Sequence, residues 1–310
     1  MTAAVPPEAL DVISAAATAT SHIRPVPDRG ADDLQGALAE VDFLVLDHER
    51  DDIRAILGQL PRLQVVQIMT AGTDWITPAL PHRVTLCTAS GSRDVPVAEW
   101  VLAALFGAST GLLESVRTQS AAHWEHFRHD EVTDKVVLIL GLGSIGCAVQ
   151  IRLQALGAEV IGIARTPREG VHSLQEFPEL LGRADALVVL APLTEQTKGI
   201  VDAAMLSRLR DGALVVNAGR GGVIDTPALL AELQAGRIRA VLDVVDPEPL
   251  PADHPLWSAP GVFISPHIAG DSGASAIRAW ELAGTQLRRY LAGESLLNVV
   301  VDGSLRGATL

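Results

Sequence analysis

Short apolar runs alternate with helix-compatible segments along most of the chain. Before residue 95 the apolar runs cover residues 43–47, 63–69 and 83–89. From residue 135 onward they cover residues 136–140, 159–164, 186–190, 213–217, 240–244 and 262–266. Runs of this length are typical of strands buried in a parallel sheet, with crossover helices between them. The pattern predicts an α/β protein with a doubly wound parallel sheet from residue 135 onward.

Longer helical patterns mark the places where the chain changes domain. One runs from Asp94 towards Gly111, and a second covers residues 114–127. A third covers residues 274–294, and we expect it to return and pack on the first domain. We predict one domain from residues 1–95 and 279–310, and a second from residues 96–278. The apolar pattern near the N-terminus is weak, so we expect a trimmed first domain.

A glycine-rich stretch, KVVLILGLGSIG at residues 135–146, joins a predicted strand to a predicted helix. Gly141, Gly143 and Gly146 have the spacing G-x-G-x-x-G. Gly141 would permit a tight turn, Gly143 would let the backbone approach a pyrophosphate, and Gly146 would let helix pack on strand. The helix N-terminus favours an anion. The stretch predicts a dinucleotide site, although such turns also occur for structural reasons alone.

The end of the next strand bears on the choice of dinucleotide. NAD-binding proteins usually carry an acidic residue there, about 20 residues after the first glycine. This chain has Ala164, Arg165 and Thr166 at that point, with Arg168 close by. Arginine can clamp a 2′-phosphate through charge-assisted hydrogen bonds. We therefore favour NADP(H), while NAD(H) stays open because Arg165 could be a solvated loop charge.

The composition and net charge of the chain limit the kinds of molecule that it is expected to bind. The chain has 24 Lys and Arg against 37 Asp and Glu, a net charge of −13, which disfavours nucleic acid and anionic membranes. Two cysteines are too few for a disulfide framework, and no signal peptide is evident. We expect a cytoplasmic protein without a nucleic-acid or membrane partner, and we predict no metal site.

Charged residues follow three successive strands of the predicted sheet. Arg220 comes after the fourth strand of the second domain, Asp243 and Glu248 after the fifth, and His267 after the sixth. Each alone has a structural explanation: a carbonyl-bridging arginine, a surface-turn glutamate or a capped core histidine. Because the carboxyl ends of parallel strands share one edge, we expect them to converge where the glycine turn lies. An Arg, a carboxylate and a His there suit reduction of a 2-oxo acid.

Another loop with ligand-binding character, TAGTDW at residues 70–75, directly follows a predicted strand of the first domain. Its small residues would leave backbone N–H groups exposed to a carboxylate. A plain turn with Asp74 as a cap is an equally good explanation of the same residues.

Five ordered motifs, GLGSIG, APLTEQTKGIVD, VNAGRGGVIDTPAL, LDVVDPEPL and SPHIAG, resemble the D-isomer-specific 2-hydroxyacid dehydrogenase family, in particular its glyoxylate/hydroxypyruvate reductase-like members. The resemblance implies two Rossmann-like domains, the smaller one flavodoxin-like and substrate-binding. It also implies a homodimer formed through the cofactor domain. Arg220 would be the substrate-binding catalytic arginine, His267 the acid/base and Glu248 its partner. The backbone of Ala71, Gly72 and Thr73 would hold the substrate carboxylate.

The residues predicted to bind the cofactor combine the glycine turn, the second-strand end and the family motifs. They are Gly141, Gly143, Ser144, Ile145, Gly146, Ala164, Arg165, Thr166, Ala191, Pro192, Thr197, Ala218, Gly219, Asp243, His267, Ala269 and Gly270. The predicted reaction is hydride transfer between NADP(H), or NAD(H), and a small 2-oxo or D-2-hydroxy acid. The alternative is a dinucleotide-sensing interaction protein of the same fold with little or no turnover. No sequence feature supports a formate- or phosphite-type dehydrogenase.

Overall fold

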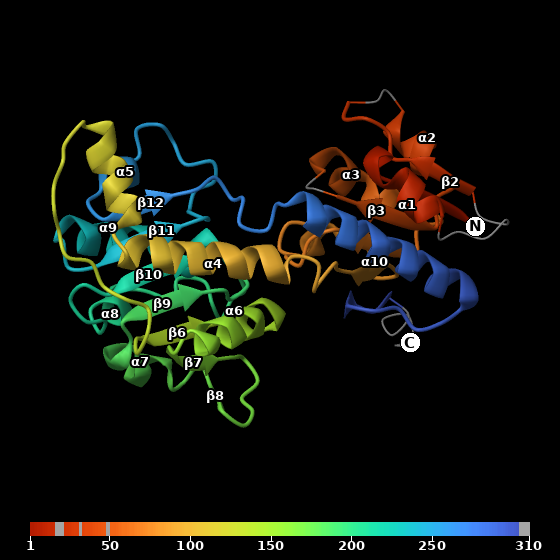
Figure 1. The fold of residues 1–310 in the computed structure, drawn as a ribbon. Helices are drawn as coiled ribbons and strands as arrows, with labels where there is room; N and C mark the ends of the chain where they lie inside the picture. Colours follow the sequence, from red (N-terminus) through yellow and green to blue (C-terminus); the bar gives the residue numbers. More distant parts are fainter. Residues whose placement is uncertain (16–21, 31–32, 48–49, 304–310) are drawn as a thin grey trace. The chain divides into compact units, whose positions relative to one another are not determined.

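The chain folds into two compact units (Figure 1). The computed structural model describes residues 1–15, 22–30, 33–47 and 50–303, so predictions for the intervening and final residues lie outside it. The discontinuous unit comprises Met1–Arg93 and Ser272–Leu310, and the central unit comprises Asp94–Asp271. The predicted boundary at 278/279 falls inside one continuous helix, α10 (Gly273–Ala292), which belongs to the discontinuous unit.

The sheet of the discontinuous unit has the order β13-β5-β4-β3-β1-β2 within the described residues. Its strands are β1 (Thr2–Val5), β2 (His22–Pro25), β3 (Phe43–Leu46), β4 (Val65–Ile68), β5 (Thr85–Cys87) and β13 (Val299–Val301). β13 runs antiparallel to β5 and the other neighbours are parallel. The parallel part has the flavodoxin-like order 2-1-3-4-5.

The weak apolar pattern near the N-terminus nevertheless marks a strand of the sheet. β1 lies inside the sheet and pairs with both β2 and β3. Its sequence, TAAV, is short and alanine-rich, so its apolar pattern is faint even though Ala3, Ala4 and Val5 are fully buried. The sheet buries these positions through tertiary packing that a local pattern does not report.

Helices cover both faces of this sheet. They are η1 (Pro7–Ala9), α1 (Leu10–Ser14), α2 (Leu34–Leu38), α3 (Asp51–Ile56), η2 (Leu57–Gln59), η3 (Thr77–Ala79) and α10. Ala279, Ala283 and Leu287 of α10 share a buried cluster with Phe43 and Val45 of β3. The returning helix therefore packs on the first unit, as the sequence predicts.

The central unit holds a wholly parallel seven-stranded sheet in the order β12-β11-β10-β9-β6-β7-β8. Its strands are β6 (Val136–Leu140), β7 (Glu159–Ile163), β8 (Val171–His172), β9 (Ala186–Val189), β10 (Leu214–Asn217), β11 (Arg239–Leu242) and β12 (Val262–Ile264). Counted from β6, this is the 3-2-1-4-5-6 order of doubly wound folds, extended by β12. The predicted fold class is confirmed.

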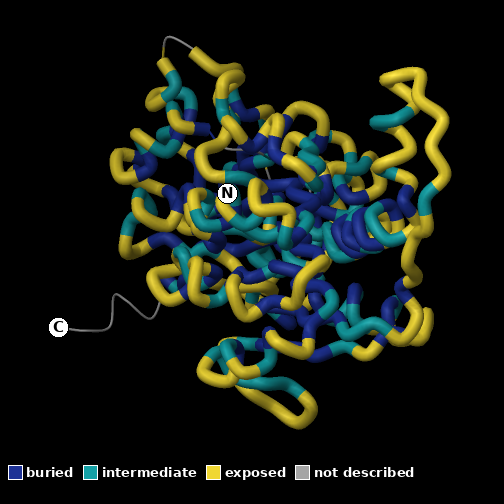
Figure 2. The backbone as a smooth tube through the Cα atoms, turned by 90° about the vertical axis from the view of Figure 1, so that its left-hand side faces the viewer, coloured by how far each residue is buried: buried dark blue, intermediate teal, exposed yellow. Residues whose placement is uncertain are grey.

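Two buried layers enclose the central sheet, because alternate strand residues face opposite sides. Leu138 and Leu140 belong to one cluster, and Val137 and Ile139 belong to the other. The helices are α4 (Asp94–Ser109), α5 (Leu112–Ser120), α6 (Ser144–Ala155), α7 (Phe177–Leu180), η4 (Leu181–Arg183), α8 (Ala203–Leu206), η5 (Gly221–Val223), α9 (Thr226–Gln234) and η6 (Pro255–Ser258). Figure 2 shows the buried positions, in dark blue, towards the interior and the exposed positions, in yellow, mainly on the outer loops.

The helix predicted over residues 114–127 ends earlier than expected. α5 stops at Ser120, and residues 123–131 form an irregular segment. Ala122 has a φ of 52°, which breaks the helix, and Trp124 is 97% exposed, so no apolar face drives helix formation there.

Within the part of the chain that the structure describes, no single helix is long and apolar enough to cross a membrane, although α4 and α5, bent by 66°, pass that test as a pair. No group of three or more His, Cys, Asp or Glu side chains in these residues could hold a metal ion.

Candidate active site

The glycine turn between β6 and α6 has the geometry that its spacing predicts. Gly141 has a φ of 108°, and a Cβ there would lie 2.5 Å from the nitrogen of Ala191. A Cβ on Gly146 would lie 2.5 Å from the oxygen of Gly141, whereas Gly143 faces open space. Gly143 is the N-cap residue of α6, and no side chain caps this helix. The first turn of α6 is therefore a place where a phosphate could approach the backbone.

The second strand, β7, ends beside this turn. Ala164 donates its N–H to the oxygen of His172 (3.0 Å), while Arg165 and Thr166 are exposed. Arg168 donates from Nη2 to the oxygen of Leu142 (3.0 Å), inside the glycine turn. The loop after β7 thus brings cationic groups to the glycine turn, and Arg168 is the one fixed there by a hydrogen bond.

The loop after β9 is held by Thr197. Its Oγ1 donates to the oxygen of Pro192 (2.5 Å) and accepts from the nitrogen of Thr194 (2.9 Å). Thr197 and Ala191 are buried, and Pro192 is exposed. Thr197 therefore shapes the loop, and its predicted contact with a cofactor stays a prediction.

Asn217, the last residue of β10, organises the loop that carries Arg220. Its side-chain oxygen accepts from the nitrogen of Gly219, and its Nδ2 donates to the oxygen of Arg220, both at 3.1 Å. Arg220 Nη1 donates to the oxygen of Gly219 (2.8 Å). Ala218 lies within this loop and donates its N–H to the oxygen of Val189 (3.1 Å). Asn217 is not among the residues predicted from the sequence, although a polar residue at the end of an apolar strand is a usable signal.

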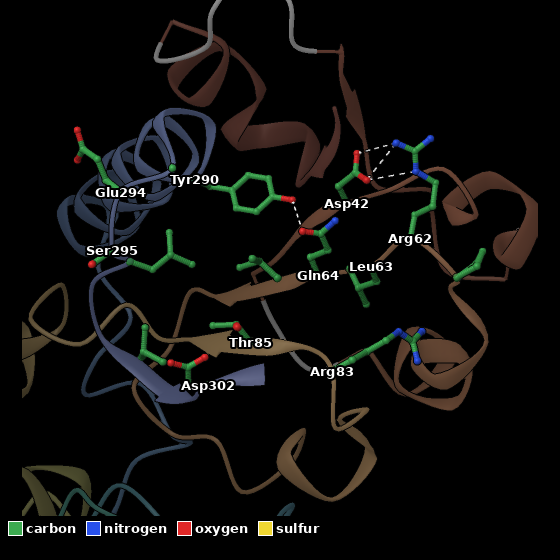
Figure 3. A pocket seen from close by; sticks show the side chains of 15 residues that line it. Asp42, Arg62, Leu63, Gln64, Arg83, Thr85, Tyr290, Glu294, Ser295 and Asp302 are labelled. Carbon is green, nitrogen blue, oxygen red and sulfur yellow. Dashed lines mark hydrogen bonds and ion pairs between the residues drawn. The ribbon is translucent and has the colours of Figure 1, made fainter. Parts of the chain in front are cut away.

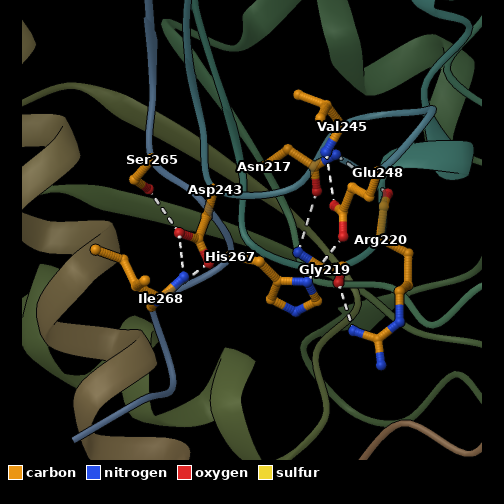
Figure 4. A network of polar contacts seen from close by, with 10 residues as sticks. Asn217, Gly219, Arg220, Asp243, Val245, Glu248, Ser265, His267 and Ile268 are labelled. Carbon is orange, nitrogen blue, oxygen red and sulfur yellow. Dashed lines mark hydrogen bonds and ion pairs between the residues drawn. The ribbon is translucent and has the colours of Figure 1, made fainter. Parts of the chain in front are cut away.

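His267 and Glu248 form a hydrogen-bonded pair (Figure 4). His267 Nδ1 lies 2.9 Å from Glu248 Oε2, and Glu248 Oε1 accepts from the nitrogen of Val245 at 2.9 Å. His267 adopts a φ of 55°, which is uncommon for residues other than glycine. Such backbone strain persists where surrounding contacts impose it, often at functional sites.

Asp243 supplies those contacts. Its buried carboxylate accepts from Ser265 Oγ (2.5 Å), Ile268 N (2.9 Å) and Ala269 N (2.8 Å), and its backbone oxygen accepts from the nitrogen of His267 (2.8 Å). Ala269 and Gly270 are buried at the end of the same loop. Both carboxylate oxygens of Asp243 serve the loop, so its side chain orients the His267 backbone, and its predicted cofactor contact stays a prediction.

Electrostatics couple the three predicted catalytic residues. The pKa of His267 is raised, chiefly by its hydrogen bond to Glu248, while burial and the charge of Arg220 oppose the rise. Burial would raise the pKa of Glu248, but hydrogen bonds from His267 and the Val245 N–H, with the charges of His267 and Arg220, lower it overall. The pair therefore favours an imidazolium beside a carboxylate.

The TAGTDW loop lies in the discontinuous unit, after β4. Ala71, Gly72 and Thr73 have no partner for their N–H groups among the described residues. The oxygen of Thr73 accepts from the nitrogens of Ile76 (3.1 Å) and Thr77 (2.9 Å), which closes the loop. Three successive unpaired amides suit a carboxylate.

The central unit thus joins a doubly wound sheet to a glycine turn and a His–Glu–Arg cluster at the carboxyl ends of parallel strands. These features define the class of Rossmann-type α/β proteins. Residues 102–269 match the family model "D-isomer specific 2-hydroxyacid dehydrogenase, NAD binding domain". The chain belongs to the D-isomer-specific 2-hydroxyacid dehydrogenase family.

Individual relatives agree with this assignment. D-3-phosphoglycerate dehydrogenase of Mycobacterium leprae is 34% identical over 295 residues, which cover 90% of this chain and 54% of that protein. The chain therefore spans about half the length of that relative.

Two solved structures resemble nearly the whole chain. A D-isomer specific 2-hydroxyacid dehydrogenase from Xanthobacter autotrophicus Py2, in complex with NADPH and MES, is 29% identical with a TM-score of 0.84. An NADPH-dependent glyoxylate/hydroxypyruvate reductase from Sinorhizobium meliloti, in complex with NADP and sulfate, is 28% identical with a TM-score of 0.83. Each match covers 98% of this chain and 99% of the other.

Proposed function

We propose that this chain reduces a small 2-oxo acid to the D-2-hydroxy acid with NADPH. The observation that carries the proposal is the hydrogen-bonded pair of His267 and Glu248, whose pKa values both respond to the charge of Arg220. A raised pKa keeps His267 charged at higher pH, so that it can donate a proton to the oxygen of the reacting ketone. Arg220 would pair with the substrate and stabilise charge on that oxygen.

The glycine turn and the loop after β7 would hold the cofactor, which supplies the hydride when bound. The open face of Gly143 and the uncapped α6 N-terminus fit the pyrophosphate. Arg165, Thr166 and Arg168 fit a 2′-phosphate, and the described residues 164–168 include no carboxylate. NADP(H) is therefore our proposal over NAD(H), and the two solved structures carry NADPH and NADP in their own sites.

The backbone amides of Ala71, Gly72 and Thr73 would bind the substrate carboxylate. Their unpaired N–H groups support this proposal, because an anion would satisfy donors that the protein leaves open. Arg220 would contribute a further charge-assisted hydrogen bond. The relatives' names point to glyoxylate, hydroxypyruvate and 3-phosphoglycerate as chemical types to compare.

We also propose a homodimer formed through the central unit. Phe106 of α4, Leu112 and Val116 of α5, and Trp124 beyond it are exposed apolar residues. Burial of such residues against a second copy would remove apolar surface from water. Trp124→Ser and Val116→Ser together should shift the mass measured by light scattering towards the monomer, and an unchanged mass would exclude this surface.

For location and other partners, we propose a cytoplasmic protein that takes only small molecules. The net charge of −13 and two free cysteines agree with this view.

The test is oxidation of NADPH and NADH, side by side, with glyoxylate, hydroxypyruvate, 3-phosphohydroxypyruvate and other 2-oxo acids. We expect turnover of at least one small 2-oxo acid, faster with NADPH at limiting cofactor. Binding of NADPH without turnover of any acid would favour the dinucleotide-sensing alternative. Equal efficiency with both cofactors would refute the NADP(H) preference.

A further inference from the structure

We infer that Arg54 is a positioning residue for substrate binding: it holds the loop Thr70–Trp75 so that the amides of Ala71, Gly72 and Thr73 face a carboxylate in a fixed arrangement. The inference rests on the proposed function, since it concerns how that substrate is bound. No motif in the sequence singles out Arg54, and the contact that suggests its role lies entirely within the discontinuous unit.

Backbone and side-chain contacts anchor the loop at both ends. At its start, the oxygen of Thr70 accepts from the nitrogen of Ala89 (3.1 Å), and Thr70 Oγ1 donates to the oxygen of Gly72 (3.1 Å). At its end, the Trp75 side chain is buried in the cluster that contains Leu57. Between these anchors the three amides depend on the loop conformation alone, because no described residue accepts their hydrogens.

Arg54 ties the end of the loop to a helix. Its Nη1 donates to the oxygen of Trp75 at 3.0 Å, and its Nη2 lies 2.8 Å from Asp51 Oδ1. The Asp51 carboxylate thus orients the guanidinium, and the guanidinium fixes the Trp75 carbonyl. A hydrogen bond from a charged donor is stronger than one from a neutral donor. The contact from Arg54 therefore restrains the Trp75 carbonyl, which follows the three amides in the chain.

The helix that carries Arg54 is itself a rigid support. Arg50, one turn earlier, is almost fully buried and donates to both oxygens of Asp52 (2.9 and 2.8 Å) and to the oxygen of Pro27 (3.0 Å). The hydrogen bond from Arg50 lowers the pKa of Asp52 to about 2, so the pair stays charged at any working pH. Because the start of α3 is fixed, Arg54 projects from a defined position towards Trp75.

Removal of the guanidinium should therefore affect carboxylate binding before anything else. Donors that are preorganised bind an anion without the entropy cost of ordering the loop. Without Arg54, the amides must be ordered at each binding event, which weakens binding of substrates that carry a carboxylate. Proton donation by His267 and cofactor binding in the central unit should be unaffected.

The experiment compares Arg54→Met, Arg54→Lys and a matched control, Arg62→Met. Arg62 lies in the same unit beside a hollow of about 1000 Å³ near the starts of β4 and β5, where it pairs with Asp42 (Figure 3). It also pairs with Glu40. For Arg54→Met we expect a roughly tenfold higher KM for glyoxylate, the equivalent of one hydrogen bond to a charged group. We expect an unchanged KM for NADPH and little change in kcat. Lysine should restore part of the loss, and Arg62→Met should behave as wild type.

A substrate without a negative charge separates positioning from general damage. The KM for the methyl ester of glyoxylate should be the same in wild type and Arg54→Met, because the ester makes no charged contact with the amides. An equal rise in KM for acid and ester would overturn the inference, as would an unchanged KM for the acid. Circular dichroism and the Tm of each variant establish that it is folded.

A binding measurement keeps this inference distinct from the proposed function. Calorimetry with oxalate in the presence of NADPH should give about tenfold weaker affinity for Arg54→Met than for wild type. If wild type reduces no 2-oxo acid but this difference is found, the proposed function fails and the role of Arg54 stands. If oxalate binds both proteins equally, or binds neither, the role of Arg54 is refuted.

Discussion

Replacement of Glu248 by glutamine should move the alkaline limit of 2-oxo acid reduction to lower pH. The substitution keeps the shape of the side chain, and its Oε1 can still accept from the Val245 N–H, which now lies 2.9 Å away. It removes the negative charge that lies 2.9 Å from His267 Nδ1. Because Glu248 raises the pKa of His267, its loss lets the imidazolium deprotonate at lower pH.

The expected size follows from the exposure of the pair. The side chains are 47% and 35% exposed, so solvent screens their attraction. A pair at this distance in water-like surroundings is stabilised by about 1 kcal/mol, which changes the ratio of charged to neutral His267 about fivefold at a given pH. The proton donor is present below the pKa of His267 and is lost as pH rises through it. Oxidation of the hydroxy acid needs neutral His267, so its acidic limb should move to lower pH as well.

The assay is the pH profile of kcat/KM for reduction, measured from NADPH absorbance between about pH 5 and pH 10 at constant ionic strength. Glu176→Gln is the matched control, since Glu176 forms a comparable bond to His172 Nδ1 (2.8 Å) elsewhere in the central unit. The control should keep the wild-type alkaline limb. An alkaline limb unchanged in Glu248→Gln would refute the pairing, and an equal movement in the control would show that the effect is not local.

Four further substitutions test other parts of the structure. Arg220→Ala should lower kcat/KM for 2-oxo acids by about 10²-fold or more with unchanged NADPH affinity, and wild-type turnover would refute its role. Arg165→Ala should raise the KM for NADPH about tenfold and leave the KM for NADH unchanged. An equal rise in both KM values would contradict a contact with the 2′-phosphate. Gly146→Ala should lower stability by about 1–3 kcal/mol in urea unfolding, because its Cβ would lie 2.5 Å from the oxygen of Gly141. Asp52→Asn should cost about 1–2 kcal/mol at pH 7, because the Asp52 side chain is 29% exposed and solvent screens its attraction to Arg50. Since the pKa of Asp52 is lowered from 3.8 to about 2, that difference should shrink as pH falls from 3.8 towards 2, and a difference independent of pH would exclude the ion pair as its cause.

Much of the fold is predictable because buried strands are visible locally. The run at residues 136–140 coincides with β6, since a strand covered on both faces needs apolar residues at every position. β1 was not predicted because its sequence is short and alanine-rich, which gives a faint apolar pattern. The helix predicted over residues 114–127 was too long, because helical composition alone does not supply a surface to pack against.

The candidate site also has features that the sequence predicts and features that depend on tertiary contacts. Its residue types and their place at strand ends are evident in the sequence, so Arg220, Glu248 and His267 could be chosen without a structure. The role of Asp243 could not be predicted from the sequence. It depends on the backbone N–H groups of Ile268 and Ala269, which follow β12, the strand paired with β11, and donate to the Asp243 carboxylate. Asn217 has a local signal, its place at the end of an apolar strand, but the partners of Asn217 and Arg54 are defined by loop geometry and cannot be predicted from the sequence.

Periodicity and turn chemistry are properties of short segments, so the α/β class, the glycine turn and the candidate catalytic residues are predictable without a structure. Long-range packing sets the strand order, the 2.9 Å contact between His267 and Glu248, and the left-handed backbone that orients His267. These depend on which strands become neighbours. That outcome is set by the packing of the whole sheet against its helices, which no single segment encodes.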